Sequence, residues 1–342
     1  MGESGSADEG ARDLRAVLAA EPDGPPARLV SLARGDLPDE PVTVRVRYSS
    51  LNYKDGLALT GAARVVRRHP MVCGVDLAGV VESSSDKGFV PGDRVIATGF
   101  GLGEDHFGGY SEIARLRPEW LVKVPEGKDE RWAMAIGTAG LTSMLCLLAL
   151  ESHGLDPEVA GGHPVVVTGA AGGVGSVAVV LAARLGYNVT AVSGRSEQAD
   201  YLRRLGATEV IARGELADAL PRPLDTERWA AGIDAVGGTT LATLLRQMRY
   251  GGCVAACGLV GGADLSTTVH PFILRGVSLI GVESVHAPIA LRRVAWDRLS
   301  RDLPEDLLEE MTVIEPLERA IELGSEIVAG RTRGRVVIEV GS

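Results

Sequence analysis

The segment VVVTGAAGGVGSVAVVLAARLG (165–186) joins an apolar run to a stretch with helical spacing through a cluster of glycines. Glycines allow a sharp turn and a close approach of the backbone to a phosphate group. The helix that follows would add free N–H groups and the positive end of its dipole. Because the strand before and the helix after are what this mechanism needs, the segment predicts a pyrophosphate site on Gly172, Gly173, Val174 and Gly175. The alternative is a glycine-rich turn without a ligand.

The second apolar run ends at Ser193, Gly194 and Arg195, about 20 residues after the glycines. A site for NAD usually carries Asp or Glu at this point, where it binds the ribose 2′-hydroxyl. A carboxylate would repel a 2′-phosphate, whereas serine and arginine can hydrogen-bond it. The sequence therefore predicts NADPH as the cofactor, with Arg213 at the end of the next strand within reach of the same phosphate. The alternative for both arginines is a solvated place on the surface.

Metal ligands in the usual spacings are missing from the sequence. It contains no CxxC and no HExxH, and Cys253 and Cys257 fall in an apolar strand pattern. Cys73 stands near His69 and Asp76, but a small apolar cysteine beside a turn is the better interpretation. We therefore expect no metal site. Since no Lewis acid would then polarise a carbonyl, an acceptor that already delocalises negative charge is favoured over an alcohol or ketone.

The elements that position these residues fall into two parts. Alternating patterns at 41–51, 76–84 and 93–99 predict strands with one wet face. From near residue 130, short apolar strands alternate with helices, which predicts βαβ units and a parallel sheet of the doubly wound, Rossmann type. The strands are expected at 163–170, 187–194, 209–213, 232–238, 251–259 and 277–282, with helices at 175–186 and 197–207 among them. A last strand pattern at 332–340 is expected to return to the first part.

Composition narrows the class of protein. The net charge of −10 argues against a nucleic-acid partner, and four scattered cysteines suit a reducing compartment. The acidic start of the chain, expected to be disordered over 1–12, lacks the features of a secretory signal. The apolar stretch 133–154 is short for a membrane span and predicts a buried helix. We expect a cytoplasmic protein without a membrane partner.

Several segments together carry a resemblance to a known family. The segments are SSLNYKDGLALTG, PMVCGVDLAGVV, GDRVIATGFGLGEDHFGGYSEIAR, IGTAGLTSMLCLLALE, VTGAAGGVGS, VSGR, MRYGGCVAACGLVGG and PFILRGVSLIGVESV. They resemble the zinc-free, quinone oxidoreductase-like branch of the medium-chain dehydrogenase/reductase superfamily, and within it the acrylyl-CoA reductase group. The resemblance covers about residues 42–340. It implies an α/β fold in which a Rossmann domain (137–289) accompanies a β-rich, GroES-like catalytic domain (1–136 and 290–342).

The resemblance also implies roles for single residues. Tyr53 would lie beside the nicotinamide, and Leu259 and Ser284 would line the cofactor channel. Asn52 and Asp76 match polar positions of the group's motifs, so with Tyr53 they are the catalytic candidates. The sequence departs from the group's motif at Cys73, where a proline or a similar residue would be expected. A homodimer is implied too, with the strand VSLIGVES pairing edge to edge.

The implied reaction is hydride transfer from NADPH to the β-carbon of acrylyl-CoA, which gives propionyl-CoA. A proton would then reach the α-carbon from Tyr53, another group or water. The basic run Arg64, Arg67, Arg68 and His69 could meet coenzyme A phosphates, although a solvated charge run is the commoner case. Likewise, HFGG (106–109) could wall the substrate pocket or simply pack.

Three other functions stay open at this point. The nearest is a reductase of quinones or of other α,β-unsaturated carbonyl compounds, which would use the same cofactor. A function of another class is a non-catalytic NADPH-binding redox sensor, because an intact nucleotide site does not prove turnover. A zinc alcohol dehydrogenase is the weakest alternative.

Overall fold

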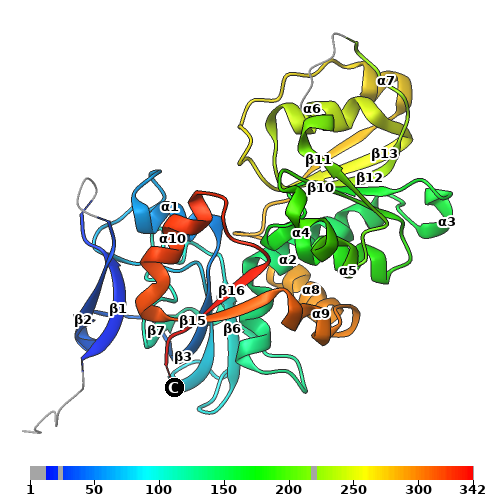
Figure 1. Cartoon of the computed structure of the whole chain (residues 1–342). Helices are drawn as coiled ribbons and strands as arrows, with labels where there is room; N and C mark the ends of the chain where they lie inside the picture. The colour runs from blue at the N-terminus through cyan, green and yellow to red at the C-terminus, as the bar shows by residue number, and fades with distance from the viewer. Residues whose placement is uncertain (1–12, 22–25, 217–221, 342) are drawn as a thin grey trace, which may run out of the picture.

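The structure, a computed structural model, describes residues 13–21, 26–216 and 222–341. The prediction for residues 1–12 lies outside the described residues. Two lobes are visible in Figure 1. One, called here the catalytic lobe, is built on a seven-stranded sheet, and the other, the nucleotide lobe, on a six-stranded sheet.

The catalytic lobe contains the strands predicted at 41–51, 76–84 and 93–99, which are confirmed as β3, β5 and β6. Its main sheet has the order β15-β16-β3-β5-β6-β8, with β7 paired to β3, and a three-stranded sheet β2-β1-β4 lies beside it. The bounds are β1 Leu14–Ala19, β2 Arg28–Leu32, β3 Val42–Ser50, β4 Met71–Val72, β5 Asp76–Ser84, β6 Arg94–Thr98, β7 Ile113–Leu116, β8 Val122–Lys123, β15 Thr312–Pro316 and β16 Arg335–Glu339.

The last strand returns to the first part of the chain, as the sequence predicts. β16 pairs antiparallel with β3, and Ile338 lies opposite Ser49. Between β15 and β16, helix α10 (Ala320–Val328) packs on α1 (Tyr53–Thr60). The two helices approach each other closely because glycines lie at their contact. A methyl group added at Gly56 would lie 2.8 Å from the carbonyl oxygen of Gly324. The C-terminal segment thereby covers the helix that begins at Tyr53.

The nucleotide lobe is the predicted doubly wound parallel sheet. Its strand order is β11-β10-β9-β12-β13-β14, and every pair is parallel. The order reverses between β9 and β12, which opens a crevice at the carboxyl ends of the strands. The bounds are β9 Val165–Val167, β10 Val189–Ser193, β11 Glu209–Ala212, β12 Trp229–Asp234, β13 Met248–Ala256, β14 Ser278–Gly281, α3 Pro157–Ala160, α4 Gly173–Arg184, α5 Ala199–Arg204, α6 Gly238–Gln247 and α7 His270–Arg275.

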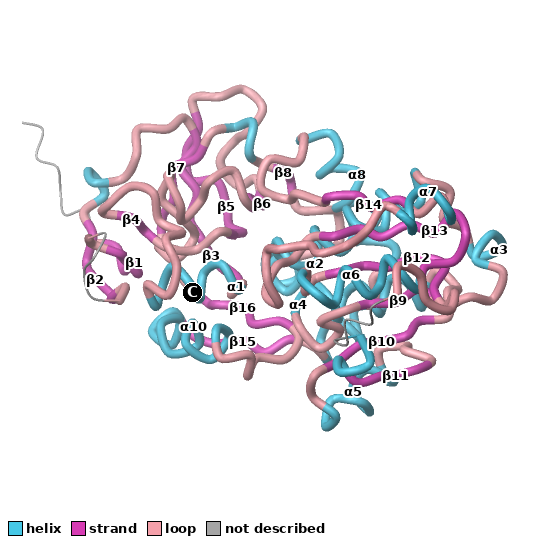
Figure 2. Tube along the Cα trace, turned by 90° about the horizontal axis from the view of Figure 1, so that it is seen from above, coloured by secondary structure: helices cyan, strands magenta, loops and turns pink. Residues whose placement is uncertain are grey.

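A long helix, α2 (Glu130–Ser152), lies at the junction of the lobes and packs against α4, β3 and β5. Figure 2 shows it between the two sets of strands. By length and composition it is the one helix of the described residues apolar enough to cross a membrane, yet 83% of its most apolar window is buried inside the fold. The prediction of a buried helix is therefore confirmed. Helices α8 (Ile289–Asp302) and α9 (Glu305–Glu310) pack against it.

The helix α2 is interrupted at Gly137, whose φ of 52° and ψ of −160° are not helical. Such a conformation is accessible to glycine and to few other residues. The predicted domain boundaries stay predictions: one falls at this kink, and the other falls one residue inside α8.

Candidate active site

The predicted cofactor residues of the nucleotide lobe all follow the carboxyl ends of its strands. The glycine loop follows β9, and Ser193 ends β10. Arg213 follows β11, Leu259 comes shortly after β13, and Ser284 shortly after β14. Because the strands are parallel, these points share one edge of the sheet, where open α/β sheets bind their ligands. The structure thus brings the predicted cofactor residues together along one crevice.

The glycine loop has the geometry of a phosphate cradle. Gly172 caps α4, and 173–175 form its first turn, whose N–H groups have no carbonyl partner within the helix. The turn is closed by a bond of 2.9 Å in which the Gly172 N–H donates to the Gly169 oxygen. A methyl group at Gly175 would lie 2.3 Å from that same oxygen. Only glycine at position 175 therefore lets α4 start this close to the turn.

The residues predicted to hold the 2′-phosphate lie side by side. Ser193 Oγ accepts a hydrogen bond of 3.1 Å from the Arg195 N–H, which shapes the turn after β10. A methyl group at Gly194 would lie 3.2 Å from the guanidinium carbon of Arg213. Arg213 therefore covers the backbone of this turn, and two cations flank the end of β10.

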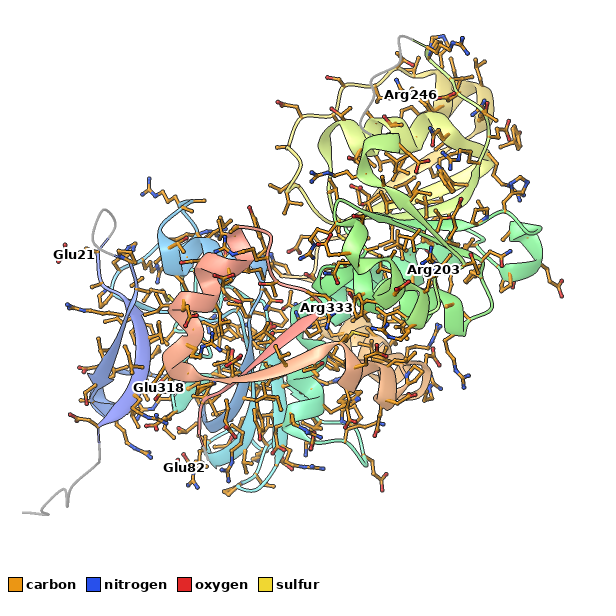
Figure 3. The ribbon with its side chains drawn as sticks, viewed as in Figure 1. Glu21, Glu82, Arg203, Arg246, Glu318 and Arg333 are labelled. Carbon is orange, nitrogen blue, oxygen red and sulfur yellow. The ribbon has the colours of Figure 1, made fainter. Side chains whose placement is uncertain are left out.

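The sequence predicts a returning strand at 332–340, but it did not show that residues 332–335 pass over the glycine loop. The Gly334 N–H donates to the Ala171 oxygen at 3.1 Å, and Arg195 Nη2 donates to the Thr332 oxygen at 3.0 Å. Arg333, labelled in Figure 3 at the junction of the lobes, lies with its guanidinium carbon 4.6 Å from the ring centroid of Tyr201. The signal that could have found it is the run TRGR at the start of the returning strand.

Arg335 is the most unusual cation of this segment. It is buried, and its Nε donates to the Ala135 oxygen at 2.8 Å. Its Nη2 has no hydrogen-bond partner among the described residues, and burial lowers the pKa of the guanidinium. A methyl group at Gly173 would lie 2.9 Å from Arg335 Nη1. Nη1 is therefore the guanidinium nitrogen beside the phosphate cradle, whereas the orphaned Nη2 lies beside Gly137, where an added methyl group would be 2.6 Å from it.

Asp76 is the centre of a buried polar network that joins the lobes. Its carboxylate accepts hydrogen bonds from Ser50 Oγ at 2.5 Å, Asn52 Nδ2 at 2.9 Å and the Thr138 N–H at 2.8 Å. Those three bonds are all to Oδ2, and the Thr138 hydroxyl donates to the other carboxylate oxygen of Asp76, Oδ1. Asp76 is fully buried, which favours a role in positioning its neighbours over contact with a substrate. A methyl group at Gly137 would lie 2.7 Å from Asp76 Oδ2.

Asn52 and Asp55 hold the start of α1. Asp55 Oδ2 accepts from the Asn52 N–H at 2.9 Å, and Asp55 Oδ1 accepts from the Val75 N–H at 2.9 Å. Burial, together with the negative charge of Asp76, raises the pKa of Asp55 to about 7. Tyr53 is the first residue of α1 and is 38% exposed. The fixed turn therefore presents the Tyr53 side chain at an accessible position.

The far end of the crevice is tied to the catalytic lobe by Arg292. This buried side chain donates to the Ser284 oxygen at 2.5 Å and to Thr98 Oγ1 at 2.7 Å. The Phe100 N–H donates to the Val285 oxygen at 2.9 Å. Ser284 is half-buried at this junction, whereas Leu259 is 66% exposed. The two predicted channel residues thus lie on adjoining loops at the same edge of the sheet.

The described residues contain no group of three or more His, Cys, Asp or Glu side chains that could hold a metal ion. Cys73 and Cys253 are buried, and burial raises the pKa of the Cys73 thiol to about 12. In the basic run, Arg67 lies 3.4 Å from Glu104 and 4.0 Å from Asp105. That cation is therefore largely neutralised by its neighbours.

Comparison with known proteins agrees with this geometry. Residues 38–126 match the model of the alcohol dehydrogenase GroES-like domain, and residues 173–301 match that of the zinc-binding dehydrogenase domain. Acrylyl-CoA reductase AcuI of Ruegeria pomeroyi is 54% identical over 317 residues, which are 92% of this chain and 95% of that protein.

Two solved structures extend the likeness to three dimensions. Escherichia coli K-12 YhdH with bound NADPH gives a TM-score of 0.92 at 48% identity, covering 95% of this chain and 100% of that one. Bacillus subtilis YhfP with NAD bound gives 0.91 at 42% identity, covering 95% and 99%.

A Rossmann sheet joined to a GroES-like lobe, with the crevice between them, defines an oxidoreductase of the nicotinamide-dependent class. The chain belongs to the medium-chain dehydrogenase/reductase family, in the group that contains AcuI and YhfP. The fold class and the family expected from the sequence are both confirmed.

Proposed function

We propose that the chain is an NADPH-dependent reductase that converts acrylyl-CoA to propionyl-CoA. The observation that carries this proposal is the 54% identity to AcuI over nearly the whole of both chains. The glycine cradle, with Arg335 Nη1 beside Gly173, fits a dinucleotide cofactor. NADPH, when bound, supplies the hydride for the β-carbon of the substrate.

Residues of this chain would hold the cofactor at three points. The free N–H groups of 173–175 and the Arg335 guanidinium would bind the pyrophosphate. Ser193, Arg195 and Arg213 would bind the 2′-phosphate, since no carboxylate of the turn 193–195 repels it. This set supports NADPH over NADH.

Tyr53 is the proposed proton donor. Reduction at the β-carbon leaves an enolate on the thioester, and the phenol of Tyr53 can give its proton to the α-carbon. The bonds of Asn52 and Asp55 fix the backbone from which the tyrosine projects. Asn52 and Asp76 act in this proposal as positioning residues.

The test compares acceptors with the purified protein. Consumption of NADPH is followed with acrylyl-CoA and with a small quinone, and kcat/KM is determined for each. The proposal expects kcat/KM to be at least about 100-fold higher for acrylyl-CoA, since only the thioester would use substrate-specific binding energy. Comparable values would favour a general reductase, and turnover with neither would favour a redox sensor. Metal analysis of the same preparation is expected to find no stoichiometric zinc.

We also propose a homodimer formed through the edge of the nucleotide sheet. β14 is the edge strand, and it leaves its outer backbone groups unpaired within the described sheet. Beside it, Val269, Ile273 and Leu274 expose large apolar side chains, Ile273 by 69%. Ile273→Glu is expected to shift the mass measured by light scattering from dimer to monomer. An unchanged dimer would place the interface elsewhere.

A further inference from the structure

A pocket of about 550 Å³ lies in the catalytic lobe, away from the polar network around Asp76. Its aromatic lining includes Phe100, His106, Phe107 and Trp120. The rings of Phe100 and Trp120 are nearly parallel, with an interplanar angle of 8°, and His106 meets Trp120 edge-on at 4.8 Å between centroids. These four residues are called the aromatic pocket below. The side chains of these four residues have no role in the site described above.

The aromatic pocket adjoins the end of the crevice where the substrate must enter. The residues proposed for the 2′-phosphate follow β10 and β11, whereas Ser284 follows β14 at the opposite edge of the sheet. The dinucleotide would therefore point its nicotinamide away from Arg195. His286, two residues after Ser284, lines the pocket, and Phe100 is bonded to Val285. A substrate bound at the nicotinamide end can thus extend into this pocket.

His106 offers an unused hydrogen-bond acceptor there. Its side chain is only 10% exposed, and Nδ1 lies 3.0 Å from the Phe107 oxygen. Because a carbonyl oxygen only accepts, Nδ1 must carry the hydrogen of this bond. Burial lowers the pKa of the ring, which favours the neutral form, in which Nε2 holds a lone pair. Nε2 has no hydrogen-bond partner among the described residues.

The carboxylate of Glu40, beside His106, offers a second hydrogen-bond acceptor to a ligand. Glu40 Oε1 lies 3.8 Å from His106 Nε2, which is too far for a hydrogen bond. The same oxygen accepts a bond of 2.9 Å from Arg117, whose guanidinium lies 5.1 Å from the ring centroid of Trp120. A ligand group with two N–H hydrogens could donate to both acceptors. An exocyclic amino group on a flat ring has that shape.

Arginine side chains lie at the rim of the aromatic pocket. Arg68 lines the pocket, is exposed and forms no ion pair within the described part of the chain. Asp105 also lines the pocket, with Arg67 4.0 Å from its carboxylate. Arg68 is therefore the rim cation that remains available to an anion.

We propose that the aromatic pocket binds the nucleotide end of the acyl-CoA substrate. The adenine ring packs against Trp120 and Phe107, its amino group donates to His106 Nε2, and Arg68 binds a phosphate. The acyl thioester then reaches the crevice past Phe100. This inference rests on the proposed function, because it names the site that binds the nucleotide end of the same substrate.

Binding is tested first, without turnover. Adenosine 3′,5′-bisphosphate, the nucleotide end of coenzyme A, is titrated calorimetrically into protein saturated with NADPH. Saturable binding is expected, weakened about tenfold in Arg68→Glu and in Trp120→Ala. The matched control is Arg28→Glu, which reverses another exposed arginine on β2 and should leave binding unchanged. No binding by the unsubstituted protein would overturn the proposal.

Turnover then separates this proposal from the function it rests on. Acrylyl-CoA is compared with acrylyl-pantetheine, which has the same reacting group but no nucleotide. In Arg68→Glu the KM for acrylyl-CoA is expected to rise about tenfold while kcat/KM for acrylyl-pantetheine stays constant. Equal effects on both thioesters, or equal KM values for both in the unsubstituted protein, would overturn the proposal but leave the reductase function standing. Reduction of neither thioester would instead refute the function, and the bisphosphate titration would still decide whether the pocket binds a nucleotide.

Discussion

Arg195 and Thr332, 137 residues apart, are joined by a hydrogen bond in which Arg195 Nη2 donates to the Thr332 oxygen at 3.0 Å. The bond ties the turn after β10 to the segment that returns to the catalytic lobe. A carbonyl partner fixes the guanidinium without neutralising it, so the positive charge remains available for a phosphate. The cofactor preference of the chain can be tested at this residue.

Arg195→Ala should discriminate between the two nicotinamide cofactors. Loss of a charge-assisted bond to the 2′-phosphate is expected to weaken NADPH binding about 10- to 100-fold and to leave NADH binding nearly unchanged. Dissociation constants from cofactor fluorescence provide the measurement. Arg184→Ala, at the exposed end of α4, is the control. Equal losses of affinity for both cofactors would show that Arg195 does not bind the 2′-phosphate.

Arg335→Met should weaken both cofactors alike. Arg335 Nη1 lies beside Gly173 in the cradle of the pyrophosphate, which NADPH and NADH share. We expect a loss of about 10-fold or more for each, with Arg335→Lys intermediate because it keeps the charge but not the planar fork. If only NADPH binding changes, Arg335 contacts the 2′-phosphate instead.

Gly137→Ala should destabilise the fold. At this φ of 52° and ψ of −160°, the new methyl group would lie 2.5 Å from Ser50 Oγ and 2.6 Å from Arg335 Nη2. Strain and overlap together are expected to cost about 2–4 kcal/mol of the free energy of unfolding. Gly154→Ala also places alanine at a positive φ, but its methyl group meets nothing within 4 Å. That control should cost only about 1–2 kcal/mol, and a similar cost for both would remove the steric argument.

Asp55 should make stability depend on pH. Its pKa is raised from 3.8 to about 7, so between these values the unfolded chain releases a proton that the folded chain keeps. The free energy of unfolding should therefore fall as pH rises through this window, by at most about 4 kcal/mol, and the contribution is fully present below pH 3.8. Asp55→Asn should flatten this part of the curve in urea unfolding at several pH values. Parallel curves for the two proteins would contradict the shift.

Tyr53→Phe tests the proton donor. Removing the phenol should lower kcat with acrylyl-CoA about 100-fold, a typical contribution of general acid catalysis, without changing NADPH binding. The ring is retained, so stacking or packing by the tyrosine would survive the substitution. Full turnover by the variant would assign Tyr53 a packing role.

The parallel sheet and the position of the glycine loop could be predicted because they rest on local patterns. The strand at 76–84 and the loop at 172–175 are visible from alternation and from glycines beside an apolar run. Several bounds differ from the prediction. Helix α4 begins at Gly173, and α5 is shorter than the helix predicted at 197–207. Strand β12 covers Trp229–Asp234 where 232–238 was predicted, and β13 covers Met248–Ala256 where 251–259 was predicted.

The contribution of Arg335 could not be predicted, because it depends on a contact between distant segments. Its neighbours Ala135 and Gly173 lie 200 and 162 residues away in the sequence. The periodicity of a sequence does not indicate a contact between segments so far apart. The short strands β1 and β4 were missed for a similar reason. β1 pairs with β2 and β4, and its residue Ala16 bridges to Ser111, so the stability of these strands comes from tertiary contacts.

In the proposed reaction, hydride passes from NADPH to the C=C bond of acrylyl-CoA. NADPH carrying deuterium at the transferred position of its nicotinamide tests this step, with mass spectrometry of the thioester product. We expect propionyl-CoA with a single deuterium on the β-carbon, formed in equal amount to the NADPH consumed. Consumption of NADPH with no label in propionyl-CoA, or with no propionyl-CoA at all, would exclude this hydride transfer.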